Sequence, residues 1–171
     1  ADFIDTPNID SLAGEGTLYR NAYSTSPVCV TARHNILTGL NSIRAGVLNN
    51  GQFIRPDYAA CGISTWPELL GENGYHTAGI GKMHFYPWDA MMGYHERVIC
   101  EDKRWLHIQD DYADLLAPKG LRKLHGNAHE GYLENRGAFM HRHPLDCSWD
   151  YFVGDAATRF IRDYHRDQPF A

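Results

Sequence analysis

The clearest pattern of apolar and polar positions in the chain runs over residues 148–164. Apolar side chains recur there in pairs spaced about four residues apart, with polar side chains between them. The apolar set is Phe152, Val153, Ala156, Ala157, Phe160, Ile161 and Tyr164. This period matches one turn of an α-helix, so it predicts a helix that packs along one side.

Three further helices are expected from their end signals and their apolar spacing. They cover residues 7–13, 29–38 and 65–73. The last of them opens with Thr65 three positions before Glu68, which is the spacing of a capping box. Proline at a first helical position and glycine just beyond a last one mark the ends of the other two.

Two strands are expected, over residues 17–23 and 75–80, each directly after a predicted helix. A helix followed by a strand, twice over, indicates an α/β fold. Residues 86–147 are rich in Gly, His, Asp and Arg and carry few apolar stripes. We interpret them as a long excursion with one short helix near residues 112–116.

Composition narrows the class of protein. The chain has 171 residues, 43% of them hydrophobic and 22% charged, which is typical of one folded domain. No apolar run approaches the roughly 18 residues of a membrane span. The formal charge of −5 argues against a nucleic-acid-binding protein, which usually has a basic face. The four cysteines lack disulfide-scaffold or zinc-site spacing, which favours a reducing, cytoplasmic compartment.

The first candidate site lies at the start of the helix expected over residues 29–38. Cys29 stands where unpaired N–H groups and the helix dipole favour negative charge. Arg33 comes four residues later, so it lies on the same face one turn away. Its fork of donors suits the oxygens of a sulfate or phosphate group. The alternative is a buried cysteine beside a solvent-exposed arginine, without a chemical role.

The second candidate site is the sequence Gly-Lys-Met-His at residues 81–84, directly after the strand expected over residues 75–80. If the chain stays extended, Lys82 and His84 point to the same side. Lysine there could neutralise an oxyanion, and histidine could move a proton. The alternative is a surface lysine and a hydrogen-bonded histidine.

Together these segments resemble the type I sulfatases of the alkaline phosphatase superfamily. The similarity begins with TPNIDSLA at residues 6–13 and continues with CVTARHNILTG at residues 29–39, which resembles the family's C-x-P-x-R signature. A third block covers residues 65–82, and GKMH at residues 81–84 resembles the family's GKWH. The blocks follow the family's order over residues 6–84, which makes the resemblance specific.

The resemblance implies an α/β fold with an alkaline-phosphatase-like central mixed sheet, flanked by helices on both sides. It implies that residues 1–171 are a fragment of the N-terminal catalytic domain, lacking the first strand and the C-terminal half. Residues 86–147 would then be an insertion on the substrate side, and the isolated fragment is expected to be inactive.

The resemblance also implies a hydrolase that acts on sulfate esters. Cys29 would be oxidised to formylglycine by a maturation enzyme, and its hydrate would attack sulfur. The hydrate would also contact a divalent metal, most often Ca²⁺, with Mn²⁺ or Mg²⁺ as alternatives. Arg33 would hold the formylglycine, Lys82 would contact the nucleophile and the sulfate, and His84 would help to eliminate sulfate. The other metal ligands are expected outside this chain, and the oligomeric state is not indicated.

Two departures from the family pattern leave alternatives open. Thr31 stands where the signature has a proline that the maturation enzyme reads, so a scaffold with an intact thiol that only binds an anionic ligand is one alternative. Met83 replaces the common tryptophan, and GKMHF with residues 92–96 is similar to bacterial members that hydrolyse phosphonate monoesters or phosphodiesters. That reaction on the same scaffold is the other alternative.

Overall fold

The computed structural model describes residues 4–101 and 105–171. Its centre is a parallel pair of strands, β1 (Ala78–Gly81) and β2 (Glu96–Ile99). The register pairs Ala78 with Glu96 and Gly81 with Ile99. His76, just before β1, also forms a parallel bridge with Phe170 near the end of the chain. Segments distant in sequence therefore meet at the position where the sequence predicts a strand.

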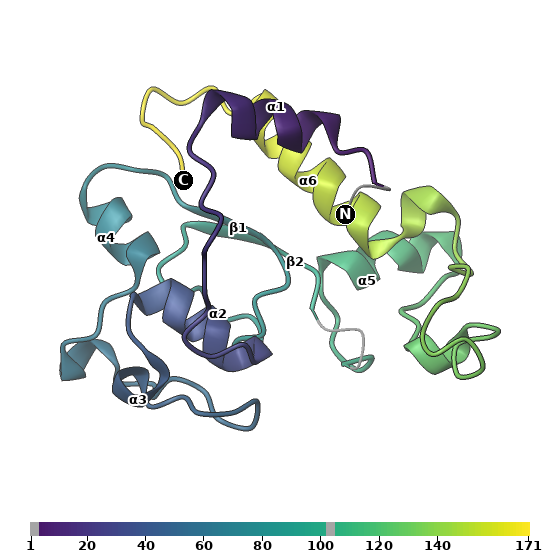
Figure 1. The fold of residues 1–171 in the computed structure, drawn as a ribbon, viewed down its shortest axis with the longest axis horizontal. Coiled ribbons are helices and arrows are strands. Elements are labelled where there is room, and N and C mark those ends of the chain that lie inside the picture. The colour runs from purple at the N-terminus through teal and green to yellow at the C-terminus, as the bar shows by residue number, and fades with distance from the viewer. Residues whose placement is uncertain (1–3, 102–104) are drawn as a thin grey trace.

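Helices lie on both sides of these strands (Figure 1). The α-helices are α1 (Pro7–Glu15), α2 (Cys29–Thr38), α3 (Ser42–Ala45), α4 (Trp66–Glu72), α5 (Asp111–Leu116) and α6 (Trp149–Asp163). Short 3₁₀ helices are η1 (Ala59–Cys61), η2 (Ala117–Lys119), η3 (Gly126–Ala128) and η4 (Leu145–Cys147). Helix α6 packs against β1, and α5 packs against β2. Each helix predicted from the sequence is present at the predicted place, to within a few residues.

Local sequence explains why α4 begins where it does. The Thr65 side chain accepts a hydrogen bond from the backbone N–H of Glu68, and the Glu68 carboxylate accepts one from the backbone N–H of Thr65. This capping box satisfies backbone donors that the first turn of a helix leaves open. The capping box predicted from the sequence is therefore confirmed.

Two apolar clusters hold the elements together. One joins Cys100, directly after β2, to residues of α5, η4 and α6: Tyr112, Leu116, Cys147 and Phe152. The other packs the start of α2 against α3 and the chain that follows it: Val30, Ala45, Val47 and Ile54. In the first cluster the buried Tyr112 hydroxyl donates to the Cys147 carbonyl at 2.6 Å, so the ring is buried without leaving its polar end unpaired.

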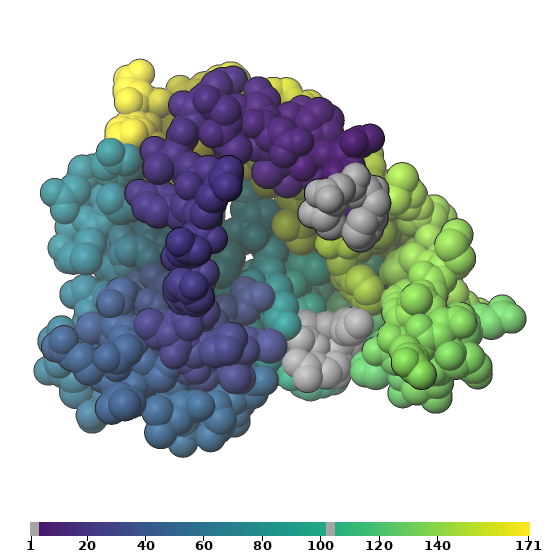
Figure 2. All heavy atoms as spheres, in the orientation of Figure 1, coloured from purple at the N-terminus to yellow at the C-terminus, as the bar shows by residue number. Residues whose placement is uncertain are grey.

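Residues 17–23 do not form the strand that the sequence predicts. They run from α1 to α2 as an irregular segment, shown in purple crossing one face in Figure 2, with a hollow beside it. Their large side chains are mostly exposed: Leu18 is 63% and Tyr23 88% accessible. Strand preference is expressed only where a neighbouring strand supplies hydrogen bonds and packing, and no described strand pairs with this segment.

Strand β2 lies within residues 86–147, which the sequence analysis treated as irregular. Only Val98 and Ile99 in β2 are aliphatic, so the run is too short to show an alternating pattern. Pairing with β1 makes it a strand. In the part of the chain that the structure describes, no helix has the length and apolar character needed to cross a lipid bilayer.

Candidate active site

Helix α2 has Cys29 at its N-terminal end. Cys29 is the first residue of the helix, and its side chain is exposed. The backbone N–H of Val30 donates to the side-chain oxygen of Asn50 at 3.0 Å, which ties the start of the helix to a nearby turn. An accessible side chain at this end of a helix lies in the partial positive charge of the backbone, which favours an anion.

Thr31, which stands at the position of the signature proline, is fully buried. It is the third residue of α2. Its hydroxyl oxygen is buried without a hydrogen-bond partner among the described residues. The hydroxyl therefore makes no hydrogen bond there that a proline would lose.

One turn further along α2, Arg33 reaches the loop that follows β1. Its guanidinium Nη1 donates a hydrogen bond to the backbone carbonyl of Lys82. Its Nε is buried and has no hydrogen-bond partner within residues 4–101 and 105–171. The guanidinium thus joins the two segments and keeps a donor available for another acceptor.

The loop at residues 81–84 does not stay extended, so the condition under which Lys82 and His84 would point to the same side is not met. Gly81 has φ 101° and His84 has φ 60°, so the backbone turns twice through the left-handed region. A Cβ on Gly81 would also lie 3.2 Å from a methyl of Val153 on α6, so glycine permits both the turn and the close packing. As a result Lys82 and His84 differ in environment: Lys82 is half-buried, whereas His84 is only 4% exposed.

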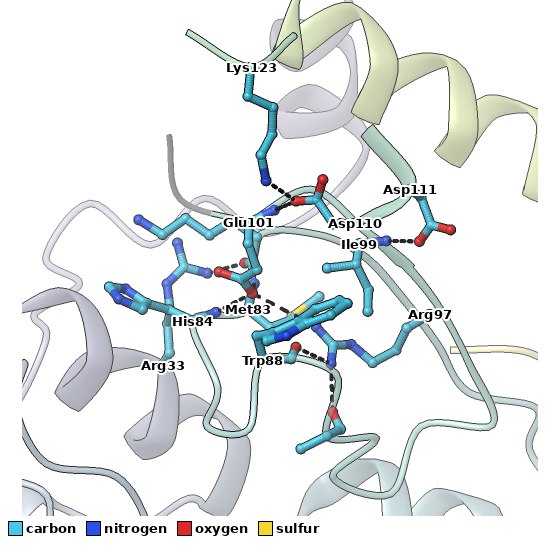
Figure 3. Close-up of polar contacts among 12 residues, drawn as sticks. Arg33, Met83, His84, Trp88, Arg97, Ile99, Glu101, Asp110, Asp111 and Lys123 are labelled. Atoms are coloured by element: carbon cyan, nitrogen blue, oxygen red, sulfur yellow. Dashed lines mark hydrogen bonds and ion pairs between the residues drawn. The ribbon is translucent and has the colours of Figure 1, made fainter. Parts of the chain in front are cut away.

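The His84 turn is held by a carboxylate from the end of β2. Glu101 Oε1 accepts hydrogen bonds from the backbone N–H of Met83 at 3.1 Å and of His84 at 2.8 Å (Figure 3). The His84 ring packs edge-on against Trp105, with ring centroids 5.0 Å apart. These contacts set the backbone and one face of the ring.

A cavity of about 430 Å³ lies where α2, the loop after β1 and α6 meet. Its lining residues are Arg33, Ile80, Gly81, Lys82, Cys100, Glu101, Trp149, Asp150 and Val153. Arg33 and Lys82 contribute two positive charges to this wall, and Glu101 and Asp150 contribute two carboxylates. The two cations themselves, rather than the net charge of the wall, would attract an anionic ligand. Cys29 does not line the cavity; it lies at the open end of α2, one turn before Arg33.

The structure thus brings Arg33, Lys82 and His84 together through one loop, with Cys29 on the helix that holds Arg33. Sequence reasoning missed Glu101 and its neighbour Arg97. Arg97 Nη2 lies 3.9 Å from Glu101 Oε1, and both side chains are almost fully buried. The available signal was an acidic residue directly after a short apolar run, the place where strands of α/β folds carry ligand-side groups.

A metal site cannot be assembled from the described residues alone. They contain no group of three or more His, Cys, Asp or Glu side chains arranged to hold a metal ion. Cys29 offers at most one ligand position, and a divalent cation such as Ca²⁺ takes six to eight oxygen ligands. We therefore assign no chemical step to a metal on these residues.

Comparison with known proteins identifies the family of the chain. Residues 3–170 match the protein-family model described as Sulfatase. The chain is 32% identical over 170 residues to arylsulfatase K of Gallus gallus, covering 98% of this chain and 27% of that protein. It is 37% identical over 94 residues to an arylsulfatase of Clostridium perfringens, covering 55% of this chain and 19% of that protein.

The fold is also found among solved structures. The phosphonate monoester hydrolase of Agrobacterium radiobacter superposes with a TM-score of 0.68 at 15% identity, covering 98% of this chain and 35% of that one. The alkaline-phosphatase-like α/β fold expected from the sequence is thereby confirmed. The chain spans only about a fifth to a third of the length of these relatives.

Proposed function

Because the chain belongs to the sulfatase family, we propose that it carries the nucleophile and the anion-binding side of a site that hydrolyses sulfate esters. The observation that carries the proposal is the hydrogen bond from Arg33 to the carbonyl of Lys82. It joins the helix that begins with Cys29 to the loop that ends with His84. Residues from two distant sequence motifs are thereby assembled around one cavity.

In this mechanism the side chain of residue 29 supplies the nucleophile, after conversion of Cys29 to formylglycine by a maturation enzyme. Arg33 holds residue 29 and offsets negative charge as the sulfate oxygens become more anionic. Lys82 contacts the sulfate group from the loop. Fixed cations of this kind stabilise a developing oxyanion because they are already oriented when the charge forms.

His84 moves the proton needed to release sulfate. Its burial against Trp105 and its fixed backbone restrict the ring to a narrow range of positions. A proton-transfer group contributes most when its geometry is set before reaction.

The proposed metal is a divalent cation, with Ca²⁺ expected and Mn²⁺ or Mg²⁺ as alternatives. The oxygens of modified residue 29 would supply part of its coordination, and the other ligands would lie outside these 171 residues. When bound, such an ion supplies Lewis-acid stabilisation of the sulfate oxygens.

A second candidate function is hydrolysis of phosphonate monoesters. The fold shared with the Agrobacterium radiobacter enzyme supports it, since both chains have the same scaffold. Sulfate and phosphonate esters are both tetrahedral and anionic, and the Arg33–Lys82 arrangement suits either.

The test compares the rates of the full-length, metal-loaded protein on an aryl sulfate and on a phenylphosphonate monoester. We expect the sulfate ester to have the higher kcat/KM. A markedly higher kcat/KM for the phosphonate would favour the second candidate. Binding of a sulfated ligand with no turnover of either ester would contradict both, and would indicate a scaffold that only binds anions.

A further inference from the structure

The buried carboxylate of Glu101 accepts two successive backbone N–H groups of the loop that carries His84. We propose that Glu101 is a positioning residue, which fixes His84 for sulfate release by holding the backbone at Met83 and His84. The inference rests on the function proposed above, and it adds a residue outside the motifs that carry the family resemblance.

The backbone of His84 has an unusual conformation. Its φ of 60° lies in the left-handed region, which residues with a Cβ seldom adopt unless their surroundings stabilise it. One oxygen of Glu101 accepts both the Met83 N–H and the His84 N–H, at 3.1 and 2.8 Å. Two successive N–H groups converge on one anionic acceptor where the chain turns locally, as it does here.

Buried charged residues surround Glu101 and hold it in place. Its own N–H donates to Asp110 Oδ2 at 2.8 Å, and the same oxygen accepts from Lys123 Nζ at 2.9 Å. On the other side, Arg97 Nη2 lies 3.9 Å from the Glu101 carboxylate. The Asp110, Lys123, Arg97 and Glu101 side chains are each at most 2% exposed. A charged acceptor in such surroundings forms strong hydrogen bonds and keeps one orientation (Figure 3).

The contacts of Glu101 indicate a positioning role rather than a catalytic one. The Glu101 oxygen that faces the loop is engaged with two backbone N–H groups, and these belong to the residues of the loop rather than to a substrate. Glu101 also lines the cavity beside Arg33 and Lys82, so a direct effect on a bound anion would appear in KM. An effect that passes through His84 should instead appear in kcat and vanish when His84 is removed.

The test uses full-length protein with four variants. Glu101→Ala removes the acceptor, whereas Glu101→Gln keeps an oxygen that can accept both N–H groups. Asp111→Ala is the matched control: Asp111 Oδ2 also accepts a backbone N–H, from Ile99 at 2.6 Å, but it does not touch residues 83 and 84. The fourth variant combines Glu101→Ala with His84→Ala.

We expect Glu101→Ala to lower kcat about 10- to 100-fold with KM changed less than about 3-fold, the size of effect that misplacing a reacting group produces. Glu101→Gln should recover most of the loss, and Asp111→Ala should stay within about 3-fold of the unsubstituted protein. In the His84→Ala background the further loss from Glu101→Ala should be under about 3-fold, because coupled residues are not additive.

Three results would overturn the positioning role. They are an unchanged kcat in Glu101→Ala, an equal loss of kcat in Glu101→Ala and Asp111→Ala, or the same loss of kcat from Glu101→Ala when His84 is already replaced by alanine. If Glu101→Ala does not fold, Glu101→Asp takes its place, because the shorter side chain draws the oxygen away from both N–H groups. A kcat of Glu101→Asp equal to that of the unsubstituted protein would also overturn the role. Absence of sulfate ester turnover by the unsubstituted protein contradicts the proposed function instead, so the two failures are distinguishable.

Discussion

The guanidinium of Arg33 donates a hydrogen bond to the backbone carbonyl of Lys82, a residue 49 positions later in the chain. This contact joins the start of α2 to the loop after β1. It also directs the arginine into the wall of the cavity, where its Nε retains a donor with no partner in the described part of the chain. The same side chain therefore holds the site together and can bind an anion.

Replacing Arg33 tests this double role. We expect Arg33→Ala to lower kcat/KM for an aryl sulfate about 100-fold or more, as losing a preoriented donor to a developing oxyanion commonly does. Arg33→Lys should recover less than about a tenth of the lost kcat/KM. An ammonium group lacks the planar set of N–H donors that can bond the Lys82 carbonyl and the anion at the same time.

The matched control is Arg159→Ala on α6, where the arginine forms an exposed ion pair with Asp155 at 2.9 Å. Its kcat/KM should stay within about 2-fold, since exposed ion pairs contribute little. An Arg33→Ala protein as active as this control would contradict the role of Arg33.

The chemistry of residue 29 can be read directly by mass spectrometry. The peptide carrying Cys29, from full-length protein made in its native host, should have the mass of an aldehyde or its hydrate. Cys29→Ala should abolish turnover. An intact thiol, from a host that converts other sulfatases, would leave a thiol-based or binding-only protein.

Thr31→Pro provides a related prediction. The position lies in the first turn of α2, where a helix does not use the backbone N–H and proline is tolerated. The buried Thr31 hydroxyl has no partner among the described residues, so its removal costs no hydrogen bond there. We expect a folded protein with an equal or higher aldehyde fraction at residue 29; a lower fraction would show that Thr31 itself is required for conversion.

His34 should make the stability of the protein depend on pH. Burial lowers the pKa of His34 below its usual 6.5, although the hydrogen bond from Nδ1 to the Val30 carbonyl acts in the opposite direction. The ring also packs edge-on against Phe85, with centroids 5.9 Å apart. The folded state therefore favours the neutral imidazole.

Proton binding by His34 sets the direction in which the free energy of unfolding changes with pH. Above pH 6.5 both folded and unfolded chains carry neutral His34, and its contribution to stability is fully present. As the pH falls below 6.5 the unfolded chain binds a proton before the folded one, so the free energy of unfolding decreases towards the lowered pKa of the folded state. Denaturant titrations at pH 7.5 and pH 5 should give a smaller decrease for His34→Phe than for the unsubstituted protein; equal decreases would contradict the assignment.

Thr65 should contribute more to stability than its size suggests. Its hydroxyl accepts the Glu68 N–H of the capping box and donates to the Met92 carbonyl at 2.9 Å, and the side chain is fully buried. We expect Thr65→Ala to lower the free energy of unfolding by about 1–3 kcal/mol, since a cap is lost and the partly buried Met92 carbonyl loses its Thr65 donor.

The matched control is Thr158→Ala on the exposed face of α6, where the hydroxyl donates a hydrogen bond to the Gly154 carbonyl within the same helix. This change should be within about 0.5 kcal/mol of neutral, as is usual for exposed helix positions. A Thr65→Ala cost no larger than that of Thr158→Ala would contradict the role of the cap.

The local features of this protein were determined by its sequence alone. The capping box at Thr65, the helix that begins at Cys29 and the apolar stripe of α6 depend on contacts within a few residues, so their pattern could be read directly. The order of the sequence motifs likewise indicated the family and the candidate residues Cys29, Arg33, Lys82 and His84.

Only the tertiary structure decided how distant segments meet. Residues 17–23 have the composition of a strand but no described partner strand, whereas residues 96–99 lack an obvious strand pattern and become β2 by pairing with β1. The turn at His84 and the carboxylate of Glu101 that holds it are 17 residues apart. Such contacts depend on how the chain folds back in space, and local spacing carries no information about that.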